Sequence, residues 1–257
     1  MGGGAVLFDI LSNYDLEEVY ISDINAELIN VYQTIRDNPD KLIEILCNMQ
    51  DEFISLDLDD RKKYYLQKRE WFHFLKIDDG AVEKAALMIF LNKTCFNGLF
   101  RVNQKGLFNV PMGAYQNPLI CDRENICAVL ERLQKVTIVC QDYKKAIDFI
   151  DNSTFVYIDP PYRPLTNTAN FTAYTVGLFC DDKQKELANF VYDIHQKGAK
   201  VLVSNSDPKN IDREDDFFDT LYQDYQIQRV NATRIINCNR VGRGKIKEIL
   251  ISNIQEE

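Results

Sequence analysis

Short apolar runs that alternate with helix-like stretches are the feature that most constrains the fold of this chain. Four runs have strand character: VYISD (19–23), VTIVC (136–140), TFVYI (154–158) and KVLVSN (200–205). Apolar residues at helical spacing lie between them, and QIQRVNA and EILIS near the carboxyl end are two further strand candidates. Strands and helices in this order predict an α/β fold with one mostly parallel sheet.

The stretch from Asp51 to Glu70 interrupts the alternation. It is densely charged, it is followed by the aromatic run WFHF, and it carries no strand signal. We therefore expect a mainly helical module inserted into the α/β domain. The expected division has three parts: the first part of the α/β domain at 1–47, the inserted module at 48–125 and the second part of the domain at 126–257.

Charge is distributed unevenly along the chain, whose net charge is −9. Neither the stretch from Asn92 to Cys121 nor that from Gln226 to Lys247 contains Asp or Glu, whereas both carry lysine and arginine. An acidic body with two basic stretches suits a protein that contacts nucleic acid on one face. An ordinary solvated surface accounts for the same charges without any ligand.

The composition argues against membrane and metal proteins. No apolar run is long enough to span a bilayer, and MGGGAVLFDIL has neither the basic start nor the cleavage site of a signal peptide. The seven cysteines form no CxxC pair, and there are only two histidines. We therefore expect free thiols, no metal ion and a cytoplasmic location.

An aspartate follows three of the strand-like runs: Asp23, Asp142 and Asp159. Ligands of open α/β sheets bind outside the carboxyl ends of the strands, so these carboxylates are expected to share one rim. Asp23 is the best candidate to bind the ribose of a cofactor. For any one of these acids, a role as a helix cap explains its position as well as a role in ligand binding. The glycines of MGGGAV are either a turn that a cofactor approaches or a frayed terminus.

The segment Asp159-Pro160-Pro161-Tyr162 stops the run TFVYI abruptly. Proline has no N–H and a fixed φ, so this segment cannot continue the strand and forms a rigid bracket. An amine conjugated to a ring is planar and a poor nucleophile. Asp159 and the Pro160 carbonyl can accept its two hydrogens and favour a pyramidal nitrogen, while Tyr162 stacks on the ring. A simple proline turn is the alternative, and we favour the site.

Several segments together resemble the Dam-type, GATC-class (D12 or alpha group) family of DNA adenine-N6 methyltransferases. They are GGGAV, YISDIN, LNKTCFNGLFRVNQKGLFNVPMGAY, CQDY, DPPYRPLTNTANFTAY, VLVSNSD and RGKIKEILISN, and they span nearly the whole chain in the family's order. The resemblance implies a class I Rossmann-like methyltransferase sheet with an inserted DNA-recognition module. It also implies S-adenosylmethionine as cofactor and duplex DNA as partner, with GATC as the expected site and flipping of the target adenine.

The resemblance also assigns roles to residues. Those expected at the cofactor are Gly2, Gly4, Asp23, Asp142 and Asp159, and the catalytic bracket is Asp159, Pro160, Pro161 and Tyr162. Phe96 stands where an aromatic side chain fills the gap left by the flipped base, and Arg101 where an arginine reads guanine. Asn97, Leu99 and Pro111 match neighbouring contacts, and Lys93 and Lys105 are expected to meet phosphates. The loop from Arg163 to Tyr174 resembles the segment that closes over the site.

The chain departs from the family at its start, where a lysine-containing motif and a Glu-Pro-Phe segment precede the glycines. We therefore expect a truncated form with unpaired strand edges and weak cofactor binding. The alternatives to a DNA adenine methyltransferase are a non-catalytic DNA-binding remnant and a methyltransferase of RNA bases or protein glutamine. The protein is expected to be a monomer, with a companion restriction endonuclease that acts on the same site without touching it.

Overall fold

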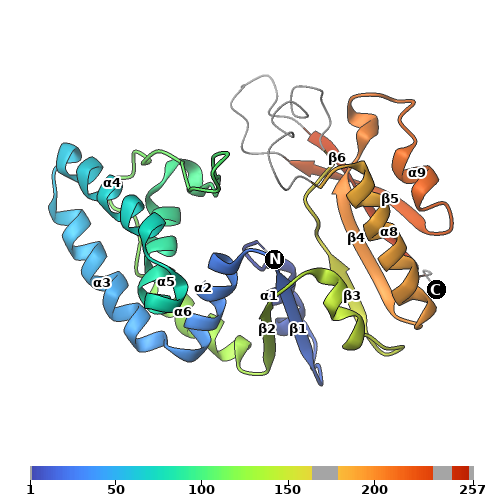
Figure 1. The fold of residues 1–257 in the computed structure, drawn as a ribbon, viewed down its shortest axis with the longest axis horizontal. Coiled ribbons are helices and arrows are strands. Elements are labelled where there is room, and N and C mark those ends of the chain that lie inside the picture. Colours follow the sequence, from blue (N-terminus) through green and yellow to red (C-terminus); the bar gives the residue numbers. More distant parts are fainter. Residues whose placement is uncertain (1, 164–178, 234–244, 255–257) are drawn as a thin grey trace. The chain divides into compact units, whose positions relative to one another are not determined.

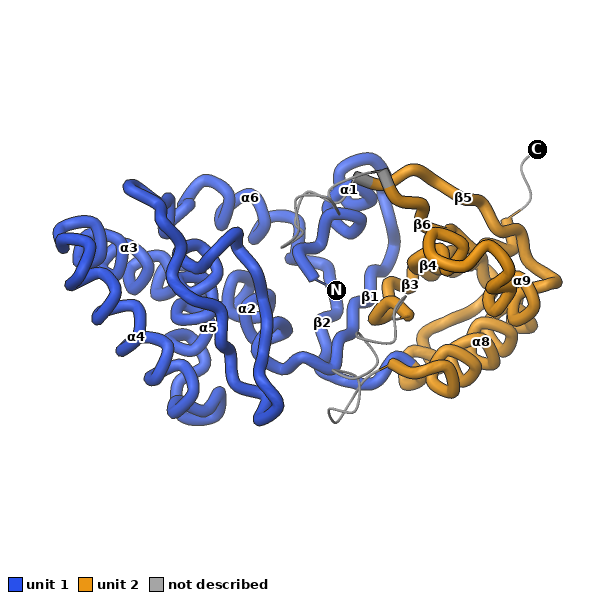
Figure 2. The backbone as a smooth tube through the Cα atoms, turned by 90° about the horizontal axis from the view of Figure 1, so that it is seen from above, with its two compact units in different colours: residues 1–143 blue, residues 144–257 orange. Residues whose placement is uncertain are grey.

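The structure is a computed structural model that describes residues 2–163, 179–233 and 245–254. Nearly all of the loop expected to close over the site lies outside these residues. The chain divides into two compact units, residues 1–143 and residues 144–257 (Figure 2). Each unit is described by itself below.

Unit 1 is mainly helical. Its elements are α1 (Ala5–Asn13), β1 (Val19–Asp23), α2 (Ala26–Asp37), α3 (Pro39–Ser55), α4 (Leu58–Phe74), α5 (Ile77–Thr94), the 3-10 turn η1 (Phe96–Gly98), α6 (Arg123–Leu133) and β2 (Val136–Cys140) (Figure 1). Side chains at the helix starts explain several of these boundaries. Asn25 accepts a hydrogen bond from Leu28 N at 3.0 Å, and Asp57 accepts one from Asp60 N at 2.9 Å.

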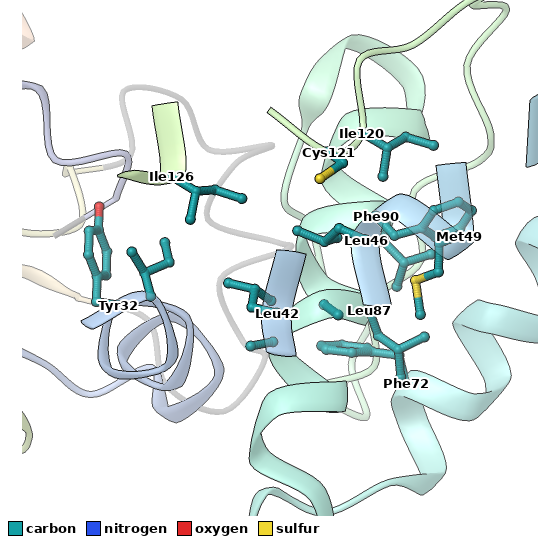
Figure 3. Packing of buried hydrophobic residues seen from close by; sticks show 14 of the residues in the cluster. Tyr32, Leu42, Leu46, Met49, Phe72, Leu87, Phe90, Ile120, Cys121 and Ile126 are labelled. Carbon is teal, nitrogen blue, oxygen red and sulfur yellow. The ribbon is translucent and has the colours of Figure 1, made fainter. Parts of the chain in front are cut away.

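The core of unit 1 forms where α2, α3, α4 and α5 pack together. Leu42 and Leu46 of α3 and Leu87 and Phe90 of α5 are fully buried, and Figure 3 shows these side chains meeting. The Phe90 ring makes an edge contact with Phe53, with ring centroids 5.5 Å apart. This helical core supports the acid-free segment that follows α5.

Unit 2 carries the second group of strands. Its elements are η2 (Tyr143–Asp148, whose first residue belongs to unit 1), β3 (Phe155–Ile158), α8 (Asp181–Gln196), β4 (Lys200–Ser206), the 3-10 turn η3 (Pro208–Asn210), α9 (Phe217–Leu221), β5 (Gln226–Thr233) and β6 (Lys245–Ser252). Helix α8 packs on β4, burying Leu187, Val191 and Ile194 beside Val201 and Val203.

The strands form two sheets rather than the single, mostly parallel sheet expected from the sequence. In unit 1, β1 and β2 are parallel. In unit 2 the order is β3-β4-β6-β5, with β3 and β4 parallel and β6 antiparallel to both of its neighbours. The segment 234–244 between β5 and β6 is shorter than the dozen or so residues that a parallel crossover needs. Within unit 1 β1 pairs with β2, and within unit 2 β3 pairs with β4.

The strands predicted from the apolar runs are confirmed within one residue at their ends, except that the strand predicted at EILIS begins three residues earlier, at Lys245. The charged stretch from Asp51 to Glu70 falls in α3 and α4, which are separated at Leu56 and Asp57. Within the described residues every helix is too short or too polar to cross a bilayer. The boundaries of the inserted module remain a prediction.

Candidate functional site

The Asp-Pro-Pro-Tyr bracket begins one residue after β3 ends, and a serine of the neighbouring strand holds its carboxylate. Ser204 Oγ donates to Asp159 Oδ1 at 3.0 Å and accepts from the Tyr157 hydroxyl at 3.2 Å. The parallel register that pairs Ile158 with Val203 brings the next residues, Asp159 and Ser204, side by side. Asp159 is exposed, so its carboxylate is oriented while still open to a ligand.

Buried polar side chains fix the backbone of the bracket on its inner side. Gln184 Nε2 donates to the Pro161 carbonyl at 3.2 Å, and Asn205 Oδ1 accepts from Arg163 N at 3.1 Å. Both amides are 1% exposed, and a 3.3 Å hydrogen bond joins them. Among the described residues none donates to the Pro160 carbonyl. The bracket therefore offers two hydrogen-bond acceptors, the oriented Asp159 carboxylate and the Pro160 carbonyl, to a ligand group that carries two N–H donors.

Arg163, directly after the bracket, is the most heavily bound residue of this region. Its guanidinium makes two bonds to Asp181, at 2.7 and 3.0 Å, and a third to Asp215 at 2.7 Å. It also stacks over the Phe217 ring at 4.2 Å. These contacts anchor the carboxyl end of the bracket to α8 and to the start of α9.

Tyr162 is half-buried, and this burial raises the pKa of its hydroxyl above the ordinary value. The hydroxyl is therefore protonated at neutral pH, which leaves the ring as an uncharged face. The sequence reasoning identified Tyr162 and Asp159 but missed the residues that position the bracket. Ser204, Asn205 and Gln184 lie far along the chain, and only the polar ending of the run KVLVSNS gave a signal.

In unit 1, two of the predicted acids lie at the same end of a parallel strand pair. Asp23 pairs with Cys140, and Gln141 N donates to the Asp23 carbonyl at 3.1 Å, so Asp142 follows at the same edge. The Asp23 carboxylate accepts from Asn25 N at 2.8 Å, but Asn25 itself caps α2. The alternative interpretation of Asp23 as a helix cap therefore does not hold, because Asn25 is the residue that caps α2. The third acid, Asp159, belongs to unit 2.

Tyr32 connects the glycine turn at residues 2–4 with Asp23. The Tyr32 hydroxyl donates to the Gly2 carbonyl at 2.9 Å, and burial together with the Asp23 carboxylate raises the pKa of Tyr32 to about 12. Gly2 and Gly4 have φ of 56° and 74°, and a Cβ at Gly4 would come within 2.8 Å of both the Tyr32 hydroxyl and the Phe8 ring. A close glycine turn and an acid at a strand end fit the nucleoside part of a cofactor.

The acid-free segment after α5 folds into an antiparallel hairpin of residues 95–113. Cys95 pairs with Met112, Val102 pairs with Phe108, and Phe96 N donates to the Pro111 carbonyl at 2.9 Å. At the tip the Asn103 side chain accepts from the backbone N–H groups of Lys105 and Leu107, at 2.9 and 3.1 Å. These bonds define a stable turn at the tip.

Helix α4 holds the inner side of this hairpin. The buried Tyr65 hydroxyl donates to the Val110 carbonyl at 2.8 Å, and His73 Nε2 lies 3.0 Å from the Phe108 carbonyl. The rings of Phe72 and Phe108 meet edge to face, with centroids 6.5 Å apart. The hairpin is thus a supported element, not a free loop.

The outer side of the hairpin carries the residues predicted to contact DNA. Phe96 is 50% exposed, and the exposed Arg101 is held by Asn109, which accepts from Nε at 2.8 Å and from Nη2 at 3.3 Å. Lys93, Asn97, Lys105 and Pro111 are exposed, and Leu99 is half-buried. In the described residues no group of three or more histidine, cysteine, aspartate or glutamate side chains is arranged to hold a metal ion.

A mixed α/β fold with an Asp-Pro-Pro-Tyr bracket at a strand end is that of a methyltransferase acting on an amino group. The profile of the D12 class N6 adenine-specific DNA methyltransferases matches residues 1–236. The chain belongs to this family. It is an adenine-specific DNA methyltransferase, and this favours DNA over the RNA-base and protein-glutamine alternatives and an enzyme over a binding remnant.

Relatives of similar length support the assignment. The Type II methyltransferase M.MjaIII of Methanocaldococcus jannaschii is 46% identical over 254 residues, which cover 98% of this chain and 86% of that protein. The Type II methyltransferase M1.LlaDCHI of Lactococcus lactis subsp. cremoris is 38% identical, with 98% and 84% covered. The DNA adenine methylase of Escherichia coli (strain K12) is 32% identical, with 97% and 83% covered.

Proposed function

We propose that the Asp159–Tyr162 bracket performs methyl transfer to N6 of adenine in duplex DNA, with S-adenosylmethionine as donor and GATC as target. The observation that carries this proposal is the carboxylate of Asp159, oriented by Ser204, one residue from the Pro160 carbonyl, to which none of the described residues donates. Asp159 and this carbonyl accept the two amine hydrogens, so the nitrogen becomes pyramidal and its lone pair points away from the bracket. Pro161 fixes the bracket, and Tyr162 stacks on the adenine.

The bound cofactor supplies a sulfonium methyl group as the electrophile. A bound S-adenosylmethionine would give its methyl group to the amine nitrogen and would leave as the neutral thioether, while Asp159 would pass the extra amine proton to solvent. Gly2, Gly4 and Asp23 fit the nucleoside part of the cofactor, with Asp23 at the ribose and Asp142 near the adenine. Asp159 is proposed to lie near both the cofactor and the target amine.

The 95–113 hairpin is proposed to read the DNA as part of a recognition module at 48–125. Arg101 is proposed to contact guanine in the major groove. Its guanidinium is already held by Asn109, so it loses little further freedom on binding. Asn97, Leu99 and Pro111 contact neighbouring bases, and Lys93 and Lys105 meet phosphates.

Base flipping is proposed because an adenine stacked in a duplex cannot reach a bracket at a sheet edge. Unpairing costs a few kcal/mol, and the half-exposed Phe96 ring can offset it by stacking in the vacated position.

The enzyme is proposed to act as a monomer. Type II methyltransferases among its relatives support a companion restriction endonuclease that acts at the same site without contact.

Replacement of Asp159 tests the catalytic proposal. Asp159→Ala should reduce methyl transfer to duplex DNA by at least about a hundredfold, because the amine loses a charged acceptor, while DNA binding is retained. Asp148→Ala, which removes another exposed aspartate of unit 2, is the matched control. Transfer of a radioactive methyl group provides the measurement. Undiminished transfer by Asp159→Ala would refute the role of the bracket.

Two variants of the hairpin test the recognition of guanine and the flipping of the target adenine separately. Arg101→Ala should lower the preference for GATC over a duplex changed at guanine by about 1–3 kcal/mol. Phe96→Ala should leave that preference intact but reduce the fluorescence increase of a 2-aminopurine placed at the target adenine. An unchanged preference in Arg101→Ala would remove its assignment to guanine, and an unchanged fluorescence increase in Phe96→Ala would remove the flipping role of Phe96.

A further inference from the structure

The second acid-free stretch, from Gln226 to Lys247, has no role in the site described above. Three of its residues, Arg229, Asn231 and Lys247, line a pocket of about 460 Å³ in unit 2. Residues at and beyond the carboxyl end of β4 complete the wall, among them Asp207, Asn210 and Arg213. All of these residues lie in the described part of the chain.

The backbone around the pocket is held rigidly. Asn210 binds the backbone of Lys247 twice, accepting from its N–H at 2.9 Å and donating to its carbonyl at 2.6 Å. Asp207, which is 1% exposed, accepts from Arg229 Nε at 3.1 Å, and Arg229 Nη2 donates to both carboxylate oxygens of Asp219 at 2.8 Å. The pocket therefore keeps its form without a ligand.

Two cations of this wall are not used in holding it. Lys209, also in the wall, pairs with Asp216 and Asp219. In contrast, no ion pair within the described residues engages the side chain of Arg213 or of Lys247, and both residues are exposed. Lys209 and Arg229 are paired with Asp207, Asp216 and Asp219, so within the described residues Arg213 and Lys247 are the wall cations left to bind an anion.

From these contacts we propose that the pocket binds a phosphodiester of the DNA backbone, outside the bases that the 95–113 hairpin reads. A polar, charged wall does not suit an apolar cofactor, whereas lysine, arginine and amide side chains are the usual partners of phosphate oxygens. The pocket is also large enough for a sugar–phosphate unit. The contact carries no sequence information, so it adds affinity equally on every duplex. This inference rests on DNA as the substrate, not on GATC as the site.

The salt dependence of DNA binding tests the proposal. For wild type and for the double variant Arg213→Gln/Lys247→Gln, binding of a labelled duplex is followed by fluorescence anisotropy from about 50 to 200 mM NaCl. Each lost phosphate contact should make the slope of log affinity against log salt less steep by about 0.9. We expect the slope of the variant to be less steep by about one to two, on GATC and non-GATC duplexes alike.

The control is Lys185→Gln/Lys200→Gln, which removes two exposed lysines of unit 2. Lys200 starts β4, at the end of the strand opposite to the pocket. Thermal unfolding establishes that each variant is folded, and Arg213→Lys/Lys247→Arg, which keeps both charges, should restore the slope. A slope equal to that of the control would overturn the proposal.

Two further outcomes distinguish this inference from others. A thermal shift of the wild type by inorganic phosphate that the variant loses, with no change in DNA slope, would assign the pocket to a free phosphate ion and overturn the DNA proposal. Loss of GATC preference in Arg213→Gln/Lys247→Gln would also overturn it, because a backbone contact cannot select bases. The proposal that GATC is the target site is tested separately, by the sequence preference of the Arg101→Ala variant.

Discussion

Asp159 owes its orientation to Ser204, which lies 45 positions away in the sequence. Ser204 donates to its carboxylate, and Tyr157 donates to Ser204, so the acid stands at the end of a short chain of hydroxyls. Such a chain fixes the direction of the carboxylate lone pairs, which matters for catalysis because misdirected acceptors do not stabilise the developing charge. Ser204 is therefore a positioning residue for the proposed reaction.

Ser204→Ala should lower the turnover number by roughly 10- to 100-fold, since a hydrogen bond to a charged group contributes about 1.5–3 kcal/mol. The KM for DNA should hardly change, because Ser204 is 3% exposed and is not available to the duplex. Tyr157→Phe keeps the bond from Ser204 to Asp159 and should have a smaller effect. Steady-state kinetics distinguish the two variants, and a rise in KM alone in Ser204→Ala would contradict the positioning role.

At the scale of elements, the 95–113 hairpin depends on α4 for its position. Val110 and Phe108 of the hairpin are 1% and 3% exposed, and their carbonyl groups meet Tyr65 and His73 of the helix. Burial lowers the pKa of His73 below its ordinary value, with the nearby cations Arg69 and Lys84 acting in the same direction. The junction between α4 and the hairpin thus contains a group whose protonation is disfavoured by folding.

This pKa shift predicts a loss of stability in mild acid. The unfolded chain takes up the proton near the ordinary pKa of about 6.5, while folded His73 resists it, so stability is full above that pH and falls as the pH decreases toward the folded pKa. The only tryptophan, Trp71, lies on the same helix. The midpoint of thermal unfolding, read from its fluorescence, should therefore fall between about pH 7 and pH 5.

His73→Gln should flatten this pH dependence, because glutamine keeps a donor near the Phe108 carbonyl but does not titrate. The matched control is His195→Gln, which removes the other histidine, on α8 of unit 2. A midpoint that falls equally in wild type and His73→Gln would show that another group is responsible.

For the whole molecule, the two units have separate sets of buried side chains. Leu46, with no exposure, belongs to the core of unit 1, whereas Leu187, at 1% exposure, is buried in unit 2 between α8 and its sheet. The hydrogen bonds of the bracket lie within unit 2, and those of the hairpin and the glycine turn lie within unit 1. The units are therefore expected to unfold as distinct cooperative bodies.

Two core variants test this expectation. Replacement of a buried leucine by alanine costs about 2–5 kcal/mol. Leu46→Ala should lower the midpoint seen by Trp71 fluorescence, whereas Leu187→Ala should lower a transition seen by circular dichroism and leave the Trp71 midpoint in place. An equal shift of the Trp71 midpoint by both variants would show that the units unfold together.

Several features of this protein follow from the chemistry of a few neighbouring residues. The strands followed from their apolar runs, and the bracket followed from two prolines that cannot continue a strand. The acid-free stretch and the strand-end acids were visible in the composition, but the hairpin that the stretch forms was not predicted. These features depend on sterics and spacing over a few residues, which the sequence states directly. The family resemblance rested on the same segments.

Only the tertiary structure decided how those pieces are held. The bonds from Ser204 to Asp159, from Tyr65 to Val110 and from Asn210 to Lys247 join residues 45, 45 and 37 positions apart. The same long-range pairing placed β6 antiparallel between β4 and β5 and formed the pocket lined by Asp207, Arg229 and Lys247. No local pattern encodes such contacts, because they arise where separate elements bury their apolar faces together and the polar groups at the margins must find partners.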